Sequence, residues 1–182
     1  MNLLTQNSNL KKSGIHGFGI TPGVTCPGCH IKCYAMRGFY KVFSKNCNKA
    51  WDYKLRATRD ASFVAEMYYQ IRDKKAKYVR IHTEGDFYSQ QYLNKWMSIA
   101  RIQPDVVFYA YTKRLDLNFN KLPSNMRIIQ SLGGEHDALL DKSKPHAVVF
   151  QTEADLIAAG YENCTTDDMR AVTAVKVGLI FH

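Results

Sequence analysis

The chain has 182 residues, of which 46% are hydrophobic and 23% are charged, and its formal net charge is +9. This length suits a single domain over residues 1–182 with a sizeable core, and the composition is that of an ordinary globular protein. No apolar run approaches the ~20 residues that span a bilayer, and no apolar signal core begins the chain, so we expect no membrane partner and a cytoplasmic location. The charge admits nucleic acid as a partner, but the basic residues are scattered along the chain, so nucleic acid is not favoured.

In the first third of the chain, the pattern of apolar and polar residues predicts helical segments around a cysteine-rich loop. Residues 1–16 show no clear period and predict an irregular lead-in, and residues 17–21 predict a short first strand. A short helix is expected over residues 34–43, followed by a polar connector over residues 44–49. The longest helical pattern then runs from residue 51 to about residue 74, where apolar side chains recur at helical spacing.

Short apolar segments alternate with helical ones through the rest of the chain. Ser89 is expected to cap a helix that runs through Ile99, and Thr166 or Asp167 to cap a last short turn. The expected strands cover residues 78–82, 106–111, 126–130, 146–150 and 175–181. This alternation predicts an α/β fold with a mainly parallel sheet of β/α units. A full eight-unit barrel typically needs ~250 residues, so a partial barrel or an open curved sheet is expected.

Polar residues follow the predicted strands directly, at His82 to Asp86, Thr112, Lys113, Ser131, Thr152 and His182. Parallel α/β folds bind ligands at the carboxyl edge of their sheet. We therefore predict a ligand pocket lined by Glu84, Gly85, Asp86, Thr112, Lys113 and Ser131. Each also has a plainer interpretation, because turns use Gly and Asp, and strand-end histidines and lysines are often structural or solvated.

Three cysteines, Cys26, Cys29 and Cys33, fall within eight residues, and Pro27-Gly28 bends the chain so that their thiols can converge. Thiolates select zinc, copper(I) or iron–sulfur clusters. Structural zinc sites usually pair two Cys-x-x-Cys knuckles, whereas a compact run of three cysteines is more typical of iron–sulfur binding. The loop predicts a 4Fe–4S cluster on these three thiols, with zinc or unligated thiols as the alternatives.

The sequence leaves the fourth ligand of such a cluster open. Cys47 follows Cys33 by fourteen residues and is one candidate, although a plain thiol is the favoured interpretation there. His30 lies inside the loop with little slack, and an exogenous ligand is the third option. Cys164 lies far along the chain beside acidic residues, and we expect an ordinary thiol there.

A thiol loop after a first strand, followed by a helix and β/α units, resembles the radical S-adenosylmethionine (SAM) superfamily. In that superfamily three cysteines hold a 4Fe–4S cluster, whose fourth iron binds SAM. Residues 80–87 resemble the turn that takes the amino group of SAM. The resemblance implies a radical-SAM-like partial barrel, with SAM as a second cofactor.

A closer resemblance is to the bacteriophage gene product 88-like family. The shared motifs are Cys26-Pro27-Gly28, Cys33-Tyr34-Ala35, Gly85-Asp86-Phe87, Tyr111-Thr112-Lys113 and Gly178-Leu179-Ile180-Phe181-His182. The resemblance implies a phage or prophage origin, and hence the cytoplasm of an infected host cell. It brings no established reaction.

Three functional hypotheses follow, and they leave enzymatic activity open. The first is a phage iron–sulfur protein with SAM-dependent radical chemistry, a small-molecule ligand over the cluster and a host reductase as partner. The second is a non-catalytic 4Fe–4S electron-transfer, redox-sensing or scaffold protein, in which Cys47 completes the cluster. The third is a zinc-stabilised nucleic-acid-binding module, which the net charge and the aromatic residues support.

Overall fold

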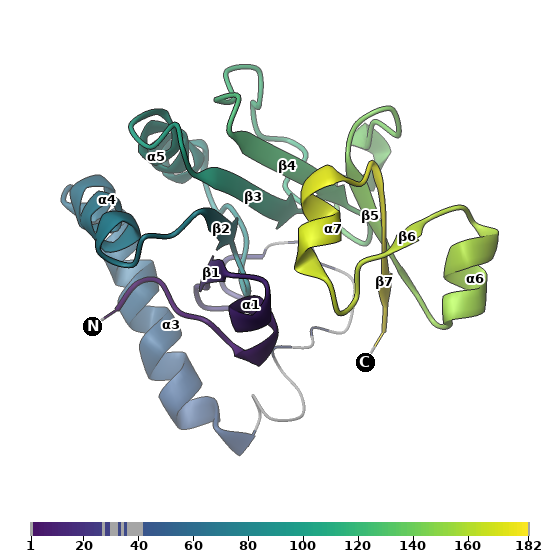
Figure 1. Cartoon of the computed structure of the whole chain (residues 1–182), viewed down its shortest axis with the longest axis horizontal. Helices are drawn as coiled ribbons and strands as arrows, with labels where there is room; N and C mark the ends of the chain where they lie inside the picture. The colour runs from purple at the N-terminus through teal and green to yellow at the C-terminus, as the bar shows by residue number, and fades with distance from the viewer. Residues whose placement is uncertain (1, 27, 30–32, 34, 36–41, 182) are drawn as a thin grey trace.

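The computed structural model describes residues 2–26, 28–29, 33, 35 and 42–181 and contains one curled, all-parallel sheet of seven strands, a half-barrel (Figure 1). The strand order is β1-β2-β3-β4-β5-β7-β6. The strands are β1 (Ile15–Phe18), β2 (Tyr78–Ile81), β3 (Val107–Thr112), β4 (Met126–Ser131), β5 (His146–Phe150), β6 (Glu162–Asn163) and β7 (Lys176–Ile180). The α/β class and the parallel sheet are therefore confirmed. Because the strands are parallel, their carboxyl ends share one edge of the sheet.

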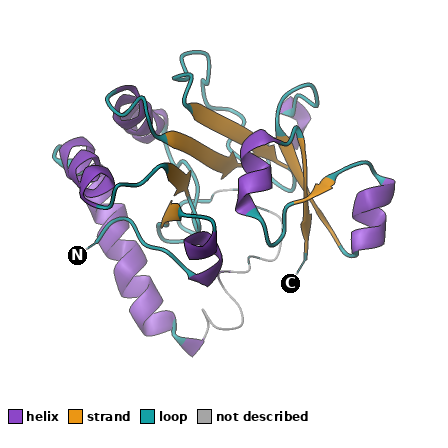
Figure 2. Ribbon diagram, viewed as in Figure 1, coloured by secondary structure: helices purple, strands orange, loops and turns teal. Residues whose placement is uncertain are grey.

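Helices lie on both sides of this sheet (Figure 2). The three long ones are α3 (Ser44–Arg59), α4 (Phe63–Asp73) and α5 (Gln90–Arg101). The short ones are α1 (Ser8–Lys12), α6 (Glu153–Ala158), α7 (Asp168–Thr173) and the 3-10 turn η2 (Asp137–Leu139). None of the helices that the structure describes combines the length and the apolar character needed to cross a bilayer.

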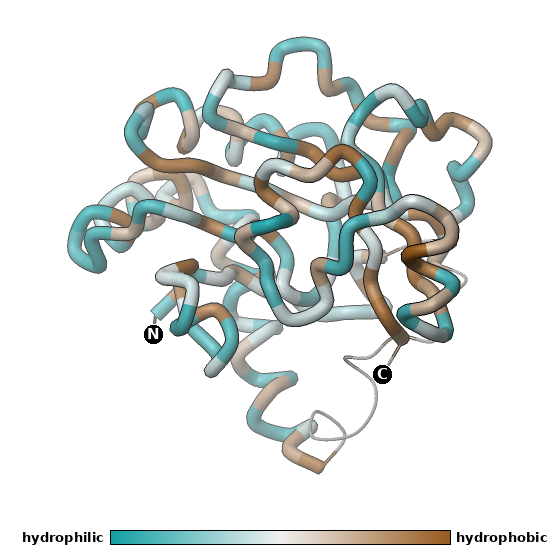
Figure 3. The backbone as a smooth tube through the Cα atoms, turned by 45° about the vertical axis from the view of Figure 1, so that its right-hand side comes forward, coloured by the Kyte–Doolittle hydropathy of each residue, from teal (hydrophilic) through white to brown (hydrophobic). Residues whose placement is uncertain are grey.

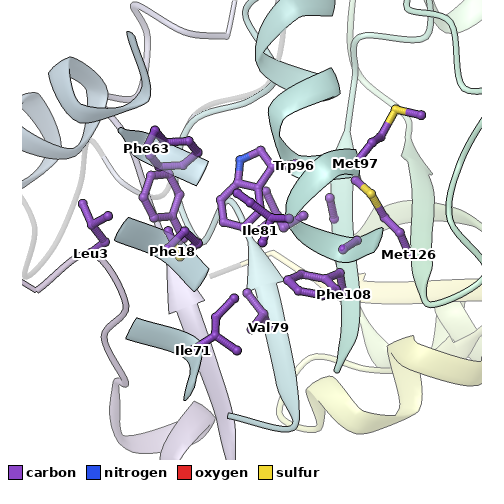
Figure 4. Close-up of a cluster of buried hydrophobic side chains, with 14 of the residues drawn as sticks. Leu3, Phe18, Phe63, Ile71, Val79, Ile81, Trp96, Met97, Phe108 and Met126 are labelled. Carbon is purple, nitrogen blue, oxygen red and sulfur yellow. The ribbon is translucent and has the colours of Figure 1, made fainter. Parts of the chain in front are cut away.

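The larger core lies between α3, α4 and α5 and one face of strands β1 to β4 (Figure 4). Its centre is an aromatic cluster in which the Phe18 ring lies edge-on to Phe63 and Trp96, at centroid distances of 5.8 and 5.2 Å. All three side chains are fully buried. Aromatic rings bury large apolar areas, so this cluster anchors α4 and α5 to the sheet.

The opposite face of the sheet carries a second, more polar core beneath α1 and α7. Arg80 of β2 forms an ion pair with Asp168 of α7 at 2.8 Å, and the Tyr109 hydroxyl donates a hydrogen bond to the same carboxylate at 3.2 Å. Arg127 of β4 donates to the carbonyl oxygen of Thr173, at the other end of α7. Strands β2, β3 and β4 therefore hold α7 against this face through charged and polar contacts.

Three expectations about helices and connectors in the first third of the chain were wrong. The lead-in is not wholly irregular, because α1 forms there: the Asn7 side chain caps it and Leu10 buries one side. The expected long helix is divided into two helices, because Asp60 has an extended backbone conformation and its carboxylate accepts a hydrogen bond from the Ser62 N–H. The expected connector that holds Cys47 is the first turn of α3. The helix expected over residues 34–43 lies largely outside the described residues.

Later elements follow the sequence more closely, and Figure 3 shows the short hydrophobic stretches, separated by hydrophilic ones, that made them predictable. β5 has the expected bounds, Ser89 caps α5 as predicted, and Asp167 caps α7. The first strand begins and ends earlier than expected, at Ile15 and Phe18. The short elements α6 and β6 were not predicted, because six and two residues are too few to show a period.

Candidate functional site

A buried carboxylate ties the carboxyl ends of β2 and β3 together. Asp86 is 5% exposed and accepts hydrogen bonds from the Thr112 hydroxyl at 2.6 Å, the Lys113 N–H at 2.9 Å and the Phe87 N–H at 2.7 Å. Burial raises the pKa of Asp86, although these hydrogen bonds and the Lys113 charge act in the opposite direction. Asp86 therefore fixes the turn after β2 against the end of β3.

Lys113 extends this connection to β4. Its ammonium group donates to the Ser131 hydroxyl at 2.7 Å and to the Leu132 carbonyl at 3.1 Å. Burial lowers the pKa of Lys113, and the neighbouring Cys29, Asp86, Asp137 and Cys26 act to raise it. Asp86, Thr112, Lys113 and Ser131, four of the predicted pocket residues, thus form one hydrogen-bonded network at the sheet edge.

The cysteine loop lies across this same edge. Cys29 forms an isolated antiparallel bridge with Gly134, which follows β4. Gly28 packs on Glu135 so closely that a Cβ there would lie 2.4 Å from the glutamate Cβ. Near its start, the loop reaches the β2 end, where the Asp86 N–H donates to the Thr25 hydroxyl at 3.4 Å. The loop is therefore fixed to the ends of both β2 and β4.

The thiols of this loop lie within electrostatic reach of the network. Burial raises the pKa of Cys26 to about 11, and the charges of Asp86 and Cys33 raise it further, against hydrogen bonds from Gly23 and Thr25. A thiol with such a pKa is protonated at neutral pH and gives up its proton when it binds a metal. Among the described residues, no group of three or more Cys, His, Asp or Glu side chains has a metal-binding arrangement. The cluster stays a prediction.

Gly85 and Glu84, the other two predicted pocket residues, have contacts different from those of the hydrogen-bonded network. Gly85 has φ +85°, and a Cβ there would lie 2.6 Å from the Ile20 side chain, so this position requires glycine. The Glu84 carboxylate accepts hydrogen bonds from the indole N–H of Trp51 at 3.2 Å and the Thr83 hydroxyl at 2.7 Å. Cys47 lines a cavity together with Glu84.

His82 and Cys164 are buried in surroundings that indicate a structural role. His82 is buried with its ring edge-on to Phe87 at 4.5 Å, and its Nε2 lies 3.0 Å from the Tyr92 hydroxyl. Burial lowers the pKa of His82 to about 3, so the ring is neutral at physiological pH. Cys164 is buried in the second core, as expected of an ordinary thiol. His182 lies outside the described residues.

Sequence reasoning did not find the residues that hold the loop in place. Thr25, Gly134 and Glu135 make the contacts between the loop and the sheet edge. A glycine pair such as Gly133-Gly134 is typical of a turn, and no pattern in the sequence indicates which loop it faces. Of these three residues, only Thr25 could have been singled out from the sequence, because it directly precedes Cys26.

The comparisons with known proteins identify a phage family. The family model described as Gene product 88 matches residues 1–179. The chain belongs to this family. Two relatives are the Gene 88 protein of Mycobacterium phage L5, 33% identical over 104 residues (50% of this chain and 44% of that protein), and that of Mycobacterium phage D29, 29% identical over 140 residues (62% and 58%). The matched segments span about half the length of these relatives. No solved structure matches, and the radical SAM resemblance finds no support in these comparisons.

Proposed function

We propose that this phage protein binds an iron–sulfur cluster, of the 4Fe–4S type, through Cys26, Cys29 and Cys33 at the carboxyl edge of its half-barrel. The observation that carries the proposal is the placement of the cysteine loop. Its contacts with Asp86 and Gly134 bring it over the network that joins β2, β3 and β4. Three soft thiolate donors on one short loop suit this type of cluster.

Lys113 supports the proposal electrostatically. Thiolates carry negative charge, and a nearby ammonium group stabilises them. The Lys113 ammonium is within electrostatic reach of Cys26 and Cys29 and is held by Ser131. In this arrangement Lys113 would offset part of the cluster's charge, and Asp86 would position Lys113 through its backbone N–H.

The finer, catalytic version of the proposal adds SAM as a ligand of the cluster. A three-cysteine cluster keeps one iron open, and with SAM bound there and an electron from a host reductase it would supply radical chemistry. Thr112, Lys113 and Ser131 would then bind and orient a substrate beside the loop. The protein can bind the cluster without binding SAM, so the two claims are tested separately.

The test is anaerobic purification with iron, sulfide and zinc quantified, followed by EPR of the reduced protein with and without SAM. About four irons per chain and a spectrum altered by SAM would support the catalytic version. Iron with a spectrum indifferent to SAM would support a cluster without that chemistry. Zinc without iron would overturn the proposal and favour the zinc-stabilised module.

Matched cysteine variants locate the ligands. We expect Cys29→Ala to lose the iron. We expect Cys47→Ala to keep it, because Cys47 lies in α3 and lines a cavity with Glu84. Loss of iron in Cys47→Ala would instead assign Cys47 as the fourth ligand, and would favour the electron-transfer, sensing or scaffold function.

A further inference from the structure

A second candidate site lies in a cavity of about 240 Å³ between α3, the segment before β1 and the turn after β2. Its polar lining includes Thr5, Trp51, Lys54, Thr83 and Glu84. These residues come from three separate parts of the chain, and the cavity exists only because α3 packs beside the β1 and β2 ends. Asp86, Lys113 and Ser131 do not line it.

Lys54 places an under-coordinated ammonium group in this cavity. The residue is 5% exposed, and its Nζ donates one long hydrogen bond, 3.4 Å, to the Thr5 hydroxyl. Its other close neighbour is the Phe18 ring, whose centroid lies 5.8 Å away. An ammonium group has three donors, and within the described residues this one bond is all that Nζ makes. Burying such a charge is costly unless its donors are used.

Glu84 provides the opposite charge. Its carboxylate is held by Trp51 and Thr83, both of which donate to Oε2. Burial lowers the pKa of Lys54 and the Glu84 charge acts to raise it, so Glu84 lies close enough to Lys54 for an electrostatic interaction. Among the described residues that line the cavity, Lys54 supplies a positive group and Glu84 a negative one.

We propose that this cavity binds a small zwitterion, a free α-amino acid or a close analogue, with its carboxylate on Lys54 and its amino group on Glu84. A simple anion would pair with Lys54 but be repelled by the Glu84 carboxylate. A simple cation would pair with Glu84 but be repelled by the Lys54 ammonium group. A molecule that carries both charges a few bonds apart complements both groups at once. The volume holds ~8 water-sized groups, which limits the ligand to small amino acids.

Calorimetric titration of the purified protein tests the proposal with four probes: L-alanine, L-methionine, acetate and methylamine. We expect at least one amino acid to bind about tenfold or more tightly than acetate and methylamine, since it makes two charge-assisted contacts where they make one. Trp51 lines the cavity and donates to Glu84, so its fluorescence should change in the same titration.

Variants assign the two charges. Lys54→Met keeps an unbranched side chain only one atom shorter, and Glu84→Gln keeps the shape of the glutamate. Each should weaken amino-acid binding by about tenfold to a hundredfold. Lys49→Met is the matched control, because Lys49 is exposed on the same helix, and it should bind as the wild type does. Circular dichroism checks that each variant is folded.

Three results would overturn the proposal. One is acetate or methylamine binding as tightly as the amino acids, which would make this an ion site. Another is amino-acid binding that persists unchanged in a folded Lys54→Met protein. The third is the absence of heat and of a fluorescence change with all four probes at millimolar concentration. Iron and zinc content do not enter this test, so its failure is distinguishable from failure of the cluster proposal.

Discussion

At the scale of single residues, the turn after β2 concentrates the unusual features of the chain. His82 has φ +62°, a left-handed conformation that is costly for a side chain with a Cβ, and Gly85 has φ +85°. Between them the chain continues beside the segment after β1, since the Thr83 N–H donates to the Phe18 carbonyl and the Ile20 N–H to the Glu84 carbonyl. It delivers Asp86 to the sheet edge, where Thr112 and Lys113 hold it. Strain of this kind persists only where surrounding contacts fix it, and it is often found at functional sites.

His82 should make the fold sensitive to acid. Its pKa is lowered to about 3 by burial, from 6.5, so the folded protein binds this proton more weakly than the unfolded chain does. The stability it contributes is fully present above pH 6.5 and is lost as the pH falls toward 3, by at most about 5 kcal/mol. Asn tolerates a positive φ and does not titrate, so His82→Asn should reduce the slope of unfolding free energy against pH between 6.5 and 3. An unchanged slope in urea unfolding at several pH values would contradict this assignment.

Gly85 should tolerate no side chain. A Cβ there would lie 2.6 Å from the Ile20 side chain and 2.9 Å from the Ile20 carbonyl oxygen. Gly85→Ala should therefore destabilise the fold by about 3 kcal/mol, through overpacking and backbone strain together. Gly14→Ala is the matched control: φ is +66° but no atom lies within 4 Å of the added Cβ, so it should cost about 1 kcal/mol. Equal losses in chemical denaturation would show that packing against Ile20 contributes nothing.

At the scale of elements, the short helix α7 depends on the sheet for its position. Six residues are too few for a stable isolated helix. α7 is held at its start through Asp168, which contacts Arg80 and Tyr109, and at its end through Arg127. Helices α4 and α5 differ, since the aromatic side chains of Phe63 and Trp96 pack them on the opposite face.

Asp168→Ala should release this helix. The substitution removes the ion pair and one hydrogen bond, and leaves a largely buried guanidinium without its carboxylate partner, so we expect a loss of about 2 kcal/mol. Arg170→Ala on the same helix breaks an exposed ion pair with Asp167 and should cost less than about 0.5 kcal/mol. Urea denaturation measures both, and a neutral Asp168→Ala variant would mean that apolar contacts alone hold α7.

At the scale of the whole molecule, the half-barrel brings two candidate sites to one region of the sheet. The cysteine loop lies over the ends of β2 to β4, and the Lys54 cavity lies beside the ends of β1 and β2, under α3. Both depend on residues 83–86, which contribute Glu84 to the cavity and Asp86 to the network. This turn is therefore where a substitution would affect both sites.

Cofactor loading should stabilise the whole fold. A cluster that binds only the folded state adds its binding free energy to stability, so anaerobic reconstitution should raise the thermal midpoint by about 5 °C or more. Cys29→Ser should abolish the increase. Cys164→Ser, which changes a buried thiol in the second core, should keep the increase even if its own midpoint is lower. An equal increase in Cys29→Ser would exclude this thiol as a ligand.

The sequence by itself determined the α/β class, the parallel sheet and most strands from β2 onward, because alternating apolar runs and caps such as Ser89 are local signals. It also predicted Asp86, Thr112, Lys113 and Ser131 at the carboxyl ends of strands, where Thr112 and Ser131 prove to be the last residues of β3 and β4. Parallel topology then requires that they share an edge. Only the tertiary structure decided the break between α3 and α4, the helical position of Cys47, the fixing of the loop by Thr25 and Gly134, and the cavity around Lys54. The fixing of the loop and the cavity arise from contacts between segments far apart in the chain, such as Trp51 with Glu84, and no local pattern encodes them. The break at Asp60 rests on a local contact with Ser62, but the helical spacing of the apolar residues continues across it.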